Sequence, residues 1–559
     1  MRGSRSAAER PGAAGVGAVV AVWLVTTLLW LTPGLTRPDG VGYFVYLTST
    51  WFDHDLLFFD EWAEAGLIRN GQFLFKDITE TNHLSNHWTA GTSLAWYPAF
   101  VAADGVGRWA VGVWESRPDG NAQARRRKSL PPNAQRPVMQ IAAVTFMSAL
   151  AGLFVMLAGM RVARAYFSDW IAAAAAIAIW LGSPLAWYSL RHGSMSHALS
   201  AAVCSGVVLL SLRLRDEVTL ARVFSLGLAI GFACAVRPQN VAIVLCPLFI
   251  AGARPLLRRA HALLLGGLIA ALPQLIVSTI LWGGPLVFVN IGGRAHSWQM
   301  FTRFRALETI FSWYHGLATW TPLLVIAIAG LVLLHRHDRG LARAGLATFA
   351  AQWLLLSSLE RWFWGGASFG QRRFDSCTIF FILGIAAVLH RLPRWIGATL
   401  TIAATAYTMV LFIAATQLNL NRFQTPSQLF AAFQTALGDP AWRSFLGFTP
   451  PPLHGTVLLA ALVTTIVVAL IFLIGRKAGT IAATVYLLAM STFYAWCGLH
   501  PHYDDVARFM LARQARGELT SAAARDTIGL LRDEAEYMHR VGRHEEAERA
   551  LREAAAIHP

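Results

Sequence analysis

Apolar residues occupy this chain in long runs separated by shorter polar connections. A helix needs about 20 predominantly apolar residues to cross the hydrocarbon core of a bilayer, and runs near that length recur. Because backbone polar groups must be paired within the segment in lipid, the pattern predicts an all-α, polytopic membrane protein. We expect about thirteen spans, at residues 15–32, 138–160, 169–187, 197–212, 222–236, 239–252, 261–282, 316–334, 341–358, 375–390, 395–415, 453–475 and 478–498.

Two apolar stretches need separate treatment. The first run is followed by Pro33-Gly34 without a small-residue cleavage site, so we expect a retained helix rather than a signal peptide. The stretch from Trp88 to Ala103 is short and contains Pro98. We expect a re-entrant or surface helix there, because an additional span would invert the topology of everything that follows.

Composition agrees with a membrane protein. Of 559 residues, 55% are hydrophobic and 14% are charged, and the mean hydropathy is +0.47. The net charge of +16 comes from 47 Lys and Arg against 31 Asp and Glu, and the excess is mostly Arg between apolar runs. This indicates membrane topology and anionic ligands rather than nucleic acid. The cysteines lie mostly inside apolar runs, where we expect them to pack: Cys204, Cys234, Cys246, Cys377 and Cys497.

Basic residues mark alternate connections, which identifies the cytoplasmic set by the positive-inside rule. This set contains Arg2/Arg5/Arg10, Arg161/Arg164, Arg213/Arg215/Arg222, Arg254/Arg258/Arg259, Arg336/Arg339/Arg343, Arg391/Arg394 and Arg476/Lys477. The remaining connections, including a large first loop at 34–137, then face outward. Within that loop, the basic run from Arg125 to Lys128 is either a solvated segment or a contact for anionic lipid headgroups.

The chain divides by composition into a membrane domain at 1–500 and a soluble helical tail at 501–559. The segment from Tyr537 to Pro559 resembles one tetratricopeptide-type helix pair. One such unit cannot bury its own apolar face, so we expect it to pack on the membrane domain, on a second copy or on a protein partner. An amphipathic hairpin without a binding role is the alternative.

Polar residues of the outward loops gather in four places. Arginines set outside against the topological bias require a compensating anion, which a phosphate or pyrophosphate on a lipid carrier would supply. Carboxylates could take a proton from an acceptor or hold a divalent cation such as Mg or Mn. The four groups are Asp39, Asp53, Asp55, Asp60 and Glu61; Asn82, His83, Asn86 and His87; Arg191, His192 and His197 with Arg237 and Asn240; and Glu360, Arg361, Arg372 and Arg373.

Three motifs carry a family resemblance. They are Arg37-Pro-Asp-Gly-Val-Gly-Tyr-Phe-Val-Tyr46, Asp53-His-Asp-Leu56 and Asn86-His-Trp-x2-Gly91-x4-Trp-x-Pro98. With the first span, the long first loop, the many later spans and the tail, they resemble the GT-C superfamily of integral-membrane glycosyltransferases. The bacterial branch of protein O-mannosyltransferases and the lipid A aminoarabinose transferase, family 39-like, is the most similar. Asp39 is followed by Gly40, where that family usually has Glu.

The resemblance implies a site and a reaction in the bacterial inner membrane, within the cell envelope. Asp39 would be the base in an inverting transfer, on the extracytoplasmic face, from a sugar on polyprenyl phosphate to an acceptor of unknown class. Asp60 and Glu61 would form a second acidic site, with His83 and His87 as further metal ligands. The donor phosphate would be held by Arg191, Arg237, Arg361, Arg372 and Arg373, chosen by charge and side alone.

Other readings of these residues stay open. Asp39 could cap the helix that begins near Val41, and Asp60 or Glu61 could start an interfacial helix. The pair His83 and His87 could serve interfacial hydrogen bonding. Arg191 and Arg237 could simply snorkel at span ends. For the whole chain, the alternatives are a transporter or flippase of a lipid-linked or anionic substrate, and an assembly scaffold that acts through its tail.

Overall fold

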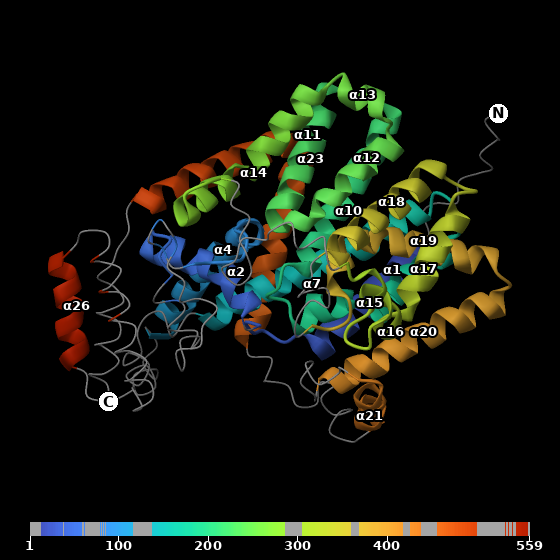
Figure 1. Ribbon diagram of the computed structural model, residues 1–559, viewed down its shortest axis with the longest axis horizontal. Coiled ribbons are helices and arrows are strands. Elements are labelled where there is room, and N and C mark those ends of the chain that lie inside the picture. The colour runs from blue at the N-terminus through green and yellow to red at the C-terminus, as the bar shows by residue number, and fades with distance from the viewer. Residues whose placement is uncertain are drawn as a thin grey trace. The chain divides into compact units, whose positions relative to one another are not determined.

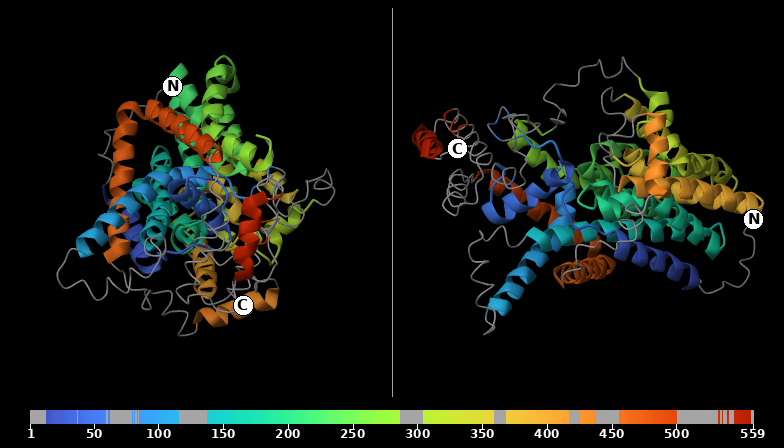
Figure 2. Two further views of the ribbon diagram at one scale, coloured as in Figure 1. Left: turned by 90° about the vertical axis from the view of Figure 1, so that its left-hand side faces the viewer. Right: turned by 90° about the horizontal axis from the view of Figure 1, so that it is seen from below.

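The structure is a computed structural model that describes most of the chain as helices. It describes residues 13–36, 38–58, 61, 79, 81, 83, 85–115, 137–285, 304–358, 368–416, 425–437, 455–499, 532, 535, 539 and 544–556. Within these ranges there are helices and loops and no β-strand (Figure 1, Figure 2). The all-α prediction is confirmed.

The chain forms two compact units, and each is assembled from segments that are far apart in the sequence. Unit 1 contains Met1–Gly34, Val144–Ala270 and His296–Ala461, and unit 2 contains Leu35–Ala143, Ala271–Ala295 and Leu462–Pro559. Three helices contribute residues to both units, namely α7 (Pro137–Ala163), α14 (Ala260–Trp282) and α23 (Gly455–Leu499).

Unit 1 holds most of the helices. In chain order they are α1 (Ala13–Trp30), α8 (Asp169–Gly182), α9 (Pro184–Ala186), η3 (Trp187–Arg191), α10 (His197–Asp216), α11 (Leu220–Val236), η4 (Pro238–Val244), α12 (Leu245–Ile250), α13 (Ala253–Leu257), α15 (Ala306–Phe311), α16 (Leu317–Trp320), α17 (Pro322–Leu334), α18 (Arg339–Ser357), η6 (Arg372–Cys377), α19 (Thr378–Arg391), α20 (Arg394–Ala415) and α21 (Pro426–Leu437). Of these, η3 is π-helical, whereas η4 and η6 are 3₁₀-helical.

Small residues let the helices of unit 1 pack backbone against backbone. A Cβ atom added at Gly330 of α17 would lie 2.0 Å from the carbonyl oxygen of Gly384 in α19, and one added at Gly384 would lie 2.0 Å from the carbonyl oxygen of Ala327. Helix α11 meets α14 in the same way, with Gly231 against Gly267. Such close approach is how apolar helices associate in lipid, where burial alone gives little driving force between them.

Loops predicted to be cytoplasmic come together at one end of unit 1. Arg215 Nη2 donates to Asp338 Oδ1 at 2.9 Å, and Tyr166 Oη donates to Asp338 Oδ2 at 2.6 Å. Phe167 packs against His337 and His390, with ring centroids 5.1 and 5.3 Å apart. Three connections that the charge pattern assigned to one side therefore meet around Asp338, which also caps α18 by accepting from Leu341 N at 2.9 Å.

Unit 2 is built around the segment that follows α1. It contains α2 (Asp39–Thr48), the π-helical η1 (Ser49–Asp53), α4 (Gly91–Glu115) and, in the tail, α26 (His544–Ala556). Asp104 of α4 connects three elements of this unit, because it accepts from Trp51 Nε1 at 3.1 Å and from Gln140 Nε2 at 3.0 Å, and pairs with Arg108 at 2.9 Å. This buried carboxylate orients η1 against α4 and α7.

Fewer helices are long enough to cross a membrane than the thirteen that the sequence predicts. In the described part of the chain, seven meet a length and hydropathy requirement, and an eighth is bent by 65° between α8 and the helix that follows. Four shorter apolar helices, of 10–17 residues, account for other predicted spans. The seven are Val138–Ala163, His197–Asp216, Ala260–Trp282, Arg372–Arg391, Arg394–Ala415, Val457–Ile474 and Ala478–Leu499.

The apolar stretch from Trp88 to Ala103 is helical, although its bounds differ from the expected ones. Helix α4 starts at Gly91, continues past the end of the apolar stretch to Glu115 and carries Pro98 inside it. It is not among the helices that meet the length and hydropathy requirement. One 25-residue helix therefore covers this stretch, and its placement as a re-entrant or surface helix stays a prediction.

Candidate functional site

A break in a long apolar helix creates the polar end of unit 1. Ser183 follows the last residue of α8, and its hydroxyl donates to the carbonyl oxygen of Ile179 at 2.6 Å. The same hydroxyl accepts from Leu185 N at 3.2 Å and so caps α9, which has Pro184 at its first position. The chain then passes through the π-helical turn η3, which ends at Arg191. Single π-helical turns inside helices occur frequently at functional sites.

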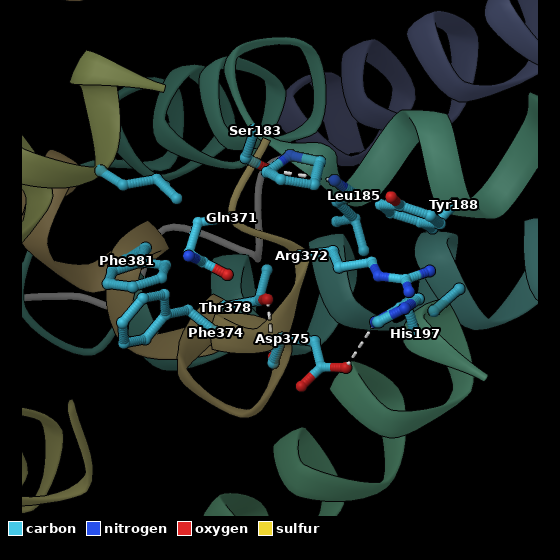
Figure 3. A pocket seen from close by; sticks show the side chains of 13 residues that line it. Ser183, Leu185, Tyr188, His197, Gln371, Arg372, Phe374, Asp375, Thr378 and Phe381 are labelled. Carbon is cyan, nitrogen blue, oxygen red and sulfur yellow. Dashed lines mark hydrogen bonds and ion pairs between the residues drawn. The ribbon is translucent and has the colours of Figure 1, made fainter. Parts of the chain in front are cut away.

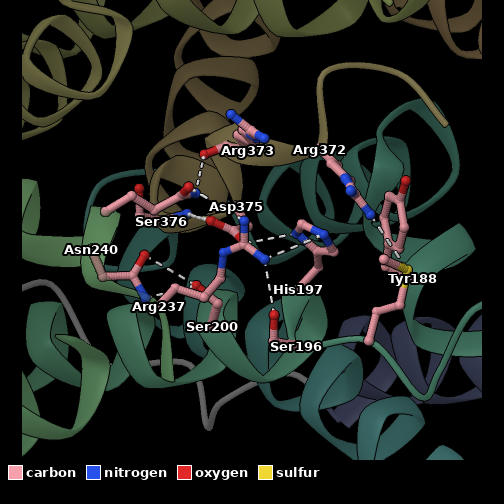
Figure 4. Close-up of polar contacts among 12 residues, drawn as sticks. Tyr188, Ser196, His197, Ser200, Arg237, Asn240, Arg372, Arg373, Asp375 and Ser376 are labelled. Atoms are coloured by element: carbon pink, nitrogen blue, oxygen red, sulfur yellow. Dashed lines mark hydrogen bonds and ion pairs between the residues drawn. The ribbon is translucent and has the colours of Figure 1, made fainter. Parts of the chain in front are cut away.

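A buried ionic cluster joins three helices at this end. His197 at the start of α10 lies with Nδ1 3.0 Å from Asp375 Oδ2, and Arg237 Nε lies 3.5 Å from the same oxygen (Figure 4). Arg237 Nη1 also donates to Ser196 Oγ at 2.9 Å and lies 3.4 Å from His197 Nε2. These partners are satisfied together when His197 is neutral, with the proton on Nδ1 donated to Asp375 and Nε2 accepting from Arg237.

Polar side chains fix the backbone that carries Asp375. Gln239 Nε2 and Gln352 Nε2 both donate to the carbonyl oxygen of Arg373, at 3.0 and 3.1 Å. Ser376 N donates to Asp375 Oδ1 at 2.8 Å. The 3₁₀-helix η6 is therefore held from η4 and from α18, and the carboxylate is oriented before any ligand arrives, which is what a preorganised site requires.

Arg372 lies beside this cluster and lines a small cavity. Its guanidinium carbon lies 5.9 Å from the centroid of the Tyr188 ring, within the range of a cation–π contact. The cavity has a volume of about 20 Å³, which is room for one water molecule (Figure 3). Its lining combines polar and aromatic side chains, including Ser183, Tyr188, His197, Gln371, Arg372, Asp375, Thr378 and Phe381.

His315 is a second buried histidine of unit 1, in the connection between α15 and α16. It is fully buried between Tyr314 and Trp320, with ring centroids 4.5 Å away in both cases. Neither ring nitrogen has a hydrogen-bond partner among the described residues. Its backbone has φ +62°, a left-handed conformation that few non-glycine residues adopt. Burial, assisted by the positive charge of Arg372, lowers the pKa of His315 to about 3.

Arg191 takes a different position from the other arginines. Its Nη1 donates to Thr32 Oγ1, just beyond the end of α1, at 3.1 Å. Thr32 N in turn donates to the carbonyl oxygen of Leu190 at 2.9 Å. Within the described ranges, no carboxylate lies within ion-pair distance of this guanidinium. Arg191 is therefore a partly buried cation without an acidic partner in that part of the chain.

In unit 2, Asp39 is the first residue of α2. The cap position is Pro38, which makes no side-chain cap hydrogen bond, and Asp39 follows it in the first turn. Its carboxylate lies in the first helical turn, where the helix dipole favours negative charge. The next turn is closely packed, because a Cβ atom at Gly42 would lie 2.1 Å from Trp88 Cε3.

The predicted motif around Asn86 holds this helix in place. Asn86 Nδ2 donates to the carbonyl oxygen of Gly42 at 3.0 Å, and its Oδ1 accepts from Trp88 N at 3.1 Å. Tyr46 Oη donates to the carbonyl oxygen of Trp88 at 2.8 Å. The segment 86–88 is therefore bound to α2, the helix that starts at Asp39. The motif that begins at Asn86 and the motif that contains Asp39 thus contact each other.

The predicted metal ligands are only partly within the described residues. Asp60 lies outside them, whereas Glu61 is buried. His83 Nδ1 lies 2.9 Å from the carbonyl oxygen of Thr81, and the ring of His87 packs against Trp282 with centroids 5.8 Å apart. In the described part of the chain, no three His, Cys, Asp or Glu side chains are placed to hold a metal ion. The metal site stays a prediction.

The sequence analysis did not predict Asp375 as a member of the ionic cluster of unit 1, and Arg361, which it did predict, lies outside the described residues. Asp375 was not proposed, although it follows Arg372 and Arg373 closely at the start of a predicted span; a carboxylate in that position could have been noticed. Of the five predicted arginines, Arg237, Arg372 and Arg373 come together at the starts of η4 and η6 (Figure 4), whereas Arg191 lies beside Thr32.

Two solved structures are similar to this chain, while no protein-family model and no curated protein sequence matches it. The first is ArnT from Cupriavidus metallidurans bound to undecaprenyl phosphate, with 16% identity over 91% of this chain and 80% of that one, at a TM-score of 0.43. The second is the Archaeoglobus fulgidus oligosaccharyltransferase in the apo form, with 13% identity over 85% of this chain and 59% of that one, at a TM-score of 0.36.

Proposed function

We propose that this protein is a membrane glycosyltransferase of GT-C type that uses a polyprenyl-phosphate-linked sugar. The observation that carries the proposal is the cluster of Arg237, Arg372, His197 and Asp375 at the ends of apolar helices. Guanidinium groups are costly to place beside lipid unless they serve a ligand or a partner. They also match the geometry of phosphate oxygens better than ammonium groups do.

In this cluster, Asp375 and His197 would position the arginine side chains for the donor phosphate and would take no part in bond making or breaking. Asp375 accepts from His197 and pairs with Arg237, so it keeps one guanidinium at a defined position in a site that is almost closed to solvent. Arg372, which lines the cavity beside Tyr188, is the group of this site that could meet a donor phosphate. Fixed charges aimed at a leaving phosphate stabilise the negative charge that develops as the sugar–phosphate bond breaks.

Asp39 is the proposed base. Its carboxylate would take the proton of the acceptor hydroxyl while the hydroxyl oxygen attacks the anomeric carbon. The bond from that carbon to the phosphate oxygen breaks, and the electron pair leaves with the lipid phosphate. Attack from the face opposite the leaving group inverts the anomeric centre. The contacts of Asn86 and Trp88 with α2 support this role because they fix the helix that carries Asp39.

We also propose that a divalent cation such as Mg or Mn binds at the first loop. Glu61, His83 and His87 are the described residues that would approach it, together with Asp60. The cation would offset phosphate charge. His83 already contacts the Thr81 carbonyl, so we assign the cation no step.

The test is turnover of the full-length protein in liposomes that contain a panel of polyprenyl-phosphate sugars. Release of lipid phosphate is measured with and without divalent metal, beside Asp39→Asn. Glu217→Gln is the control, because that carboxylate is 63% exposed and pairs only with Arg222. We expect release by the wild type and the control and a loss of about 100-fold or more in Asp39→Asn. Full release by a folded Asp39→Asn would remove Asp39 from the reaction.

A transporter or flippase is the second candidate, and the broken helix favours it. Helices interrupted near a buried polar site, like the 65° break after α8, are typical of transporters. The same liposomes distinguish the two functions. A flippase would move the lipid-linked sugar across the bilayer without releasing lipid phosphate, whereas a transferase releases it.

A further inference from the structure

We propose that an apolar groove on unit 1 holds the isoprenoid tail of the donor, with its phosphate on Arg191 at the polar end of the groove. This inference rests on the proposed function and deepens it. It adds Arg191 to Arg372 as a second contact of the donor phosphate, and it gives the lipid a place on helices that the sequence did not connect.

The groove is formed by α1, α8 and α20. Its volume is about 630 Å³, within the range of about 300–1,000 Å³ that is usual for ligand pockets. Apolar side chains line it, including Val25, Leu29 and Trp30 of α1, Leu181 of α8, and Met409 and Ile413 of α20.

The one polar side chain in the lining is already satisfied. Thr26 Oγ1 donates to the Val22 carbonyl oxygen at 2.8 Å and accepts from Trp180 Nε1 at 3.0 Å. The groove therefore presents no polar group that lacks a partner to an occupant, and its chemistry suits a hydrocarbon chain.

One end of the groove leads to Arg191. Trp30 is the last residue of α1 and lies in the lining, and Thr32, two residues later, accepts the hydrogen bond from Arg191 at 3.1 Å. Phe412 packs on Trp30 and on Trp187, with centroids 4.9 and 5.0 Å away, so one aromatic group joins the groove to η3. A cation thus lies directly beyond the apolar lining.

The charge of Arg191 identifies the kind of head group. Among the residues that the structure describes, no carboxylate lies within ion-pair distance of it. A partly buried guanidinium at the edge of the hydrocarbon region is stabilised by an anion, and phosphate oxygens accept from it in a bidentate manner. A single groove takes a single chain, which fits an isoprenoid monophosphate better than a bilayer phospholipid with two acyl chains.

The first experiment maps the tail directly. Full-length protein in nanodiscs is photolysed with a polyprenyl phosphate that carries a diazirine in its isoprenoid chain, and labelled peptides are identified by mass spectrometry. We expect labels on α1 and α20, removed by unlabelled polyprenyl phosphate and not by phosphatidylglycerol. Equal competition by phosphatidylglycerol would show a general lipid surface, and labels confined to other helices would show that the tail lies elsewhere. Either result overturns the inference.

The second experiment compares matched variants by their affinity for polyprenyl phosphate. Val25→Trp fills the groove, whereas Leu28→Trp adds the same ring on the same helix outside the lining; Val25 and Leu28 are 53% and 55% exposed. We expect Val25→Trp to weaken binding about tenfold by displacing buried chain, and Leu28→Trp to bind as the wild type does. Arg191→Gln should weaken binding, and Arg191→Lys should restore part of it. Equal affinity of the two tryptophan variants would contradict the groove.

Failure of the inference and failure of the proposed function are distinguishable. If the wild type binds polyprenyl phosphate but Val25→Trp and Arg191→Gln bind equally well, the donor site lies elsewhere and the proposed function stands. If the wild type neither binds the lipid nor is labelled by it on any helix, both proposals fail. Thermal unfolding of each variant establishes that a loss of binding is not a loss of folding.

Discussion

His197 and Asp375 meet at 3.0 Å although they lie 178 positions apart in the sequence. The carboxylate that receives this hydrogen bond is also the partner of Arg237. One anionic group therefore compensates a guanidinium and fixes the tautomer of an imidazole in a part of unit 1 that is almost closed to solvent.

Asp375→Asn should destabilise the protein strongly. Asparagine keeps the shape and a hydrogen bond to His197 but leaves Arg237 buried without a counter-charge, which typically costs about 3–5 kcal/mol. Thermal unfolding in detergent measures the effect. The double variant Asp375→Asn/Arg237→Gln should recover part of the lost stability. A single variant as stable as the wild type would show that the pair is not needed for folding.

Gly42→Ala should impair the first-loop site. The added methyl would lie 2.1 Å from Trp88 Cε3, so Trp88 must move, and crowding of this kind costs about 1–3 kcal/mol. Because Trp88 and Asn86 hold the helix of Asp39, we also expect reduced turnover. Gly105→Ala is the control, since nothing lies within 4 Å of a Cβ atom there. Equal activity of the two variants would contradict a close fit of Trp88 on α2.

His315 should make the protein sensitive to mild acid. Its pKa falls from 6.5 to about 3 on folding, so below pH 6.5 the unfolded chain takes a proton that the folded chain does not. Stability is therefore lost as the pH falls from about 6.5 toward 3, by on the order of 3 kcal/mol at pH 4. Thermal unfolding of the wild type and of His315→Gln between pH 7 and 4 measures this loss. Parallel pH curves would show that His315 does not contribute.

The contribution of Asp338 to stability should be lost at a lower pH than that at which the effect of His315 begins. Burial alone raises the pKa of this carboxyl, but hydrogen bonds from Arg215 and Tyr166 outweigh it and lower the pKa from 3.8 to about 2. The advantage of the wild type over Asp338→Asn, on the order of 1 kcal/mol for this partly screened group, is present above pH 3.8 and is lost as the pH falls through about 2.

Unfolding curves at pH 6, 4 and 2 follow this advantage. Glu217→Gln, which removes an exposed ion pair, should differ little from the wild type throughout. An advantage of the wild type over Asp338→Asn that persists unchanged to pH 2 would contradict the assignment.

The apolar pattern predicted the helices because, in lipid, a single spanning segment can pair its backbone N–H and C=O groups only as a helix. The run at 138–160 became α7, Pro137–Ala163, and the two runs after 453 became two helical segments of α23 that meet at a kink at Ala478. The charge pattern also predicted that the connections around Arg215 and Asp338 would share one end, and they do.

Partners that are distant in the sequence could not be predicted in this way. Nothing near Asp375 indicates that its partners are His197 and Arg237, because that pairing depends on how α10, η4 and η6 pack. The break at Ser183-Pro184 divided one expected span into α8 and the short α9, which continues into the π-helical turn η3. The apolar pattern gives the length of a span. The break at Ser183 changes the direction of the helix axis without changing the length of the apolar run, so the pattern does not show it.

The interleaved construction of unit 1 has a consequence for how the protein is made. Trp23 of α1 donates its indole N–H to the carbonyl oxygen of Ala149 in α7, 126 residues later, at 2.9 Å. At about 5–20 residues per second, the ribosome needs roughly 6–25 s to add those residues. During that interval the first helix has left the ribosome before its partner has been synthesised, so it must wait in the insertion machinery or in the bilayer. Biogenesis of this protein therefore depends on a delayed pairing step, and a chaperone that shields α1 until α7 has been synthesised would affect its yield.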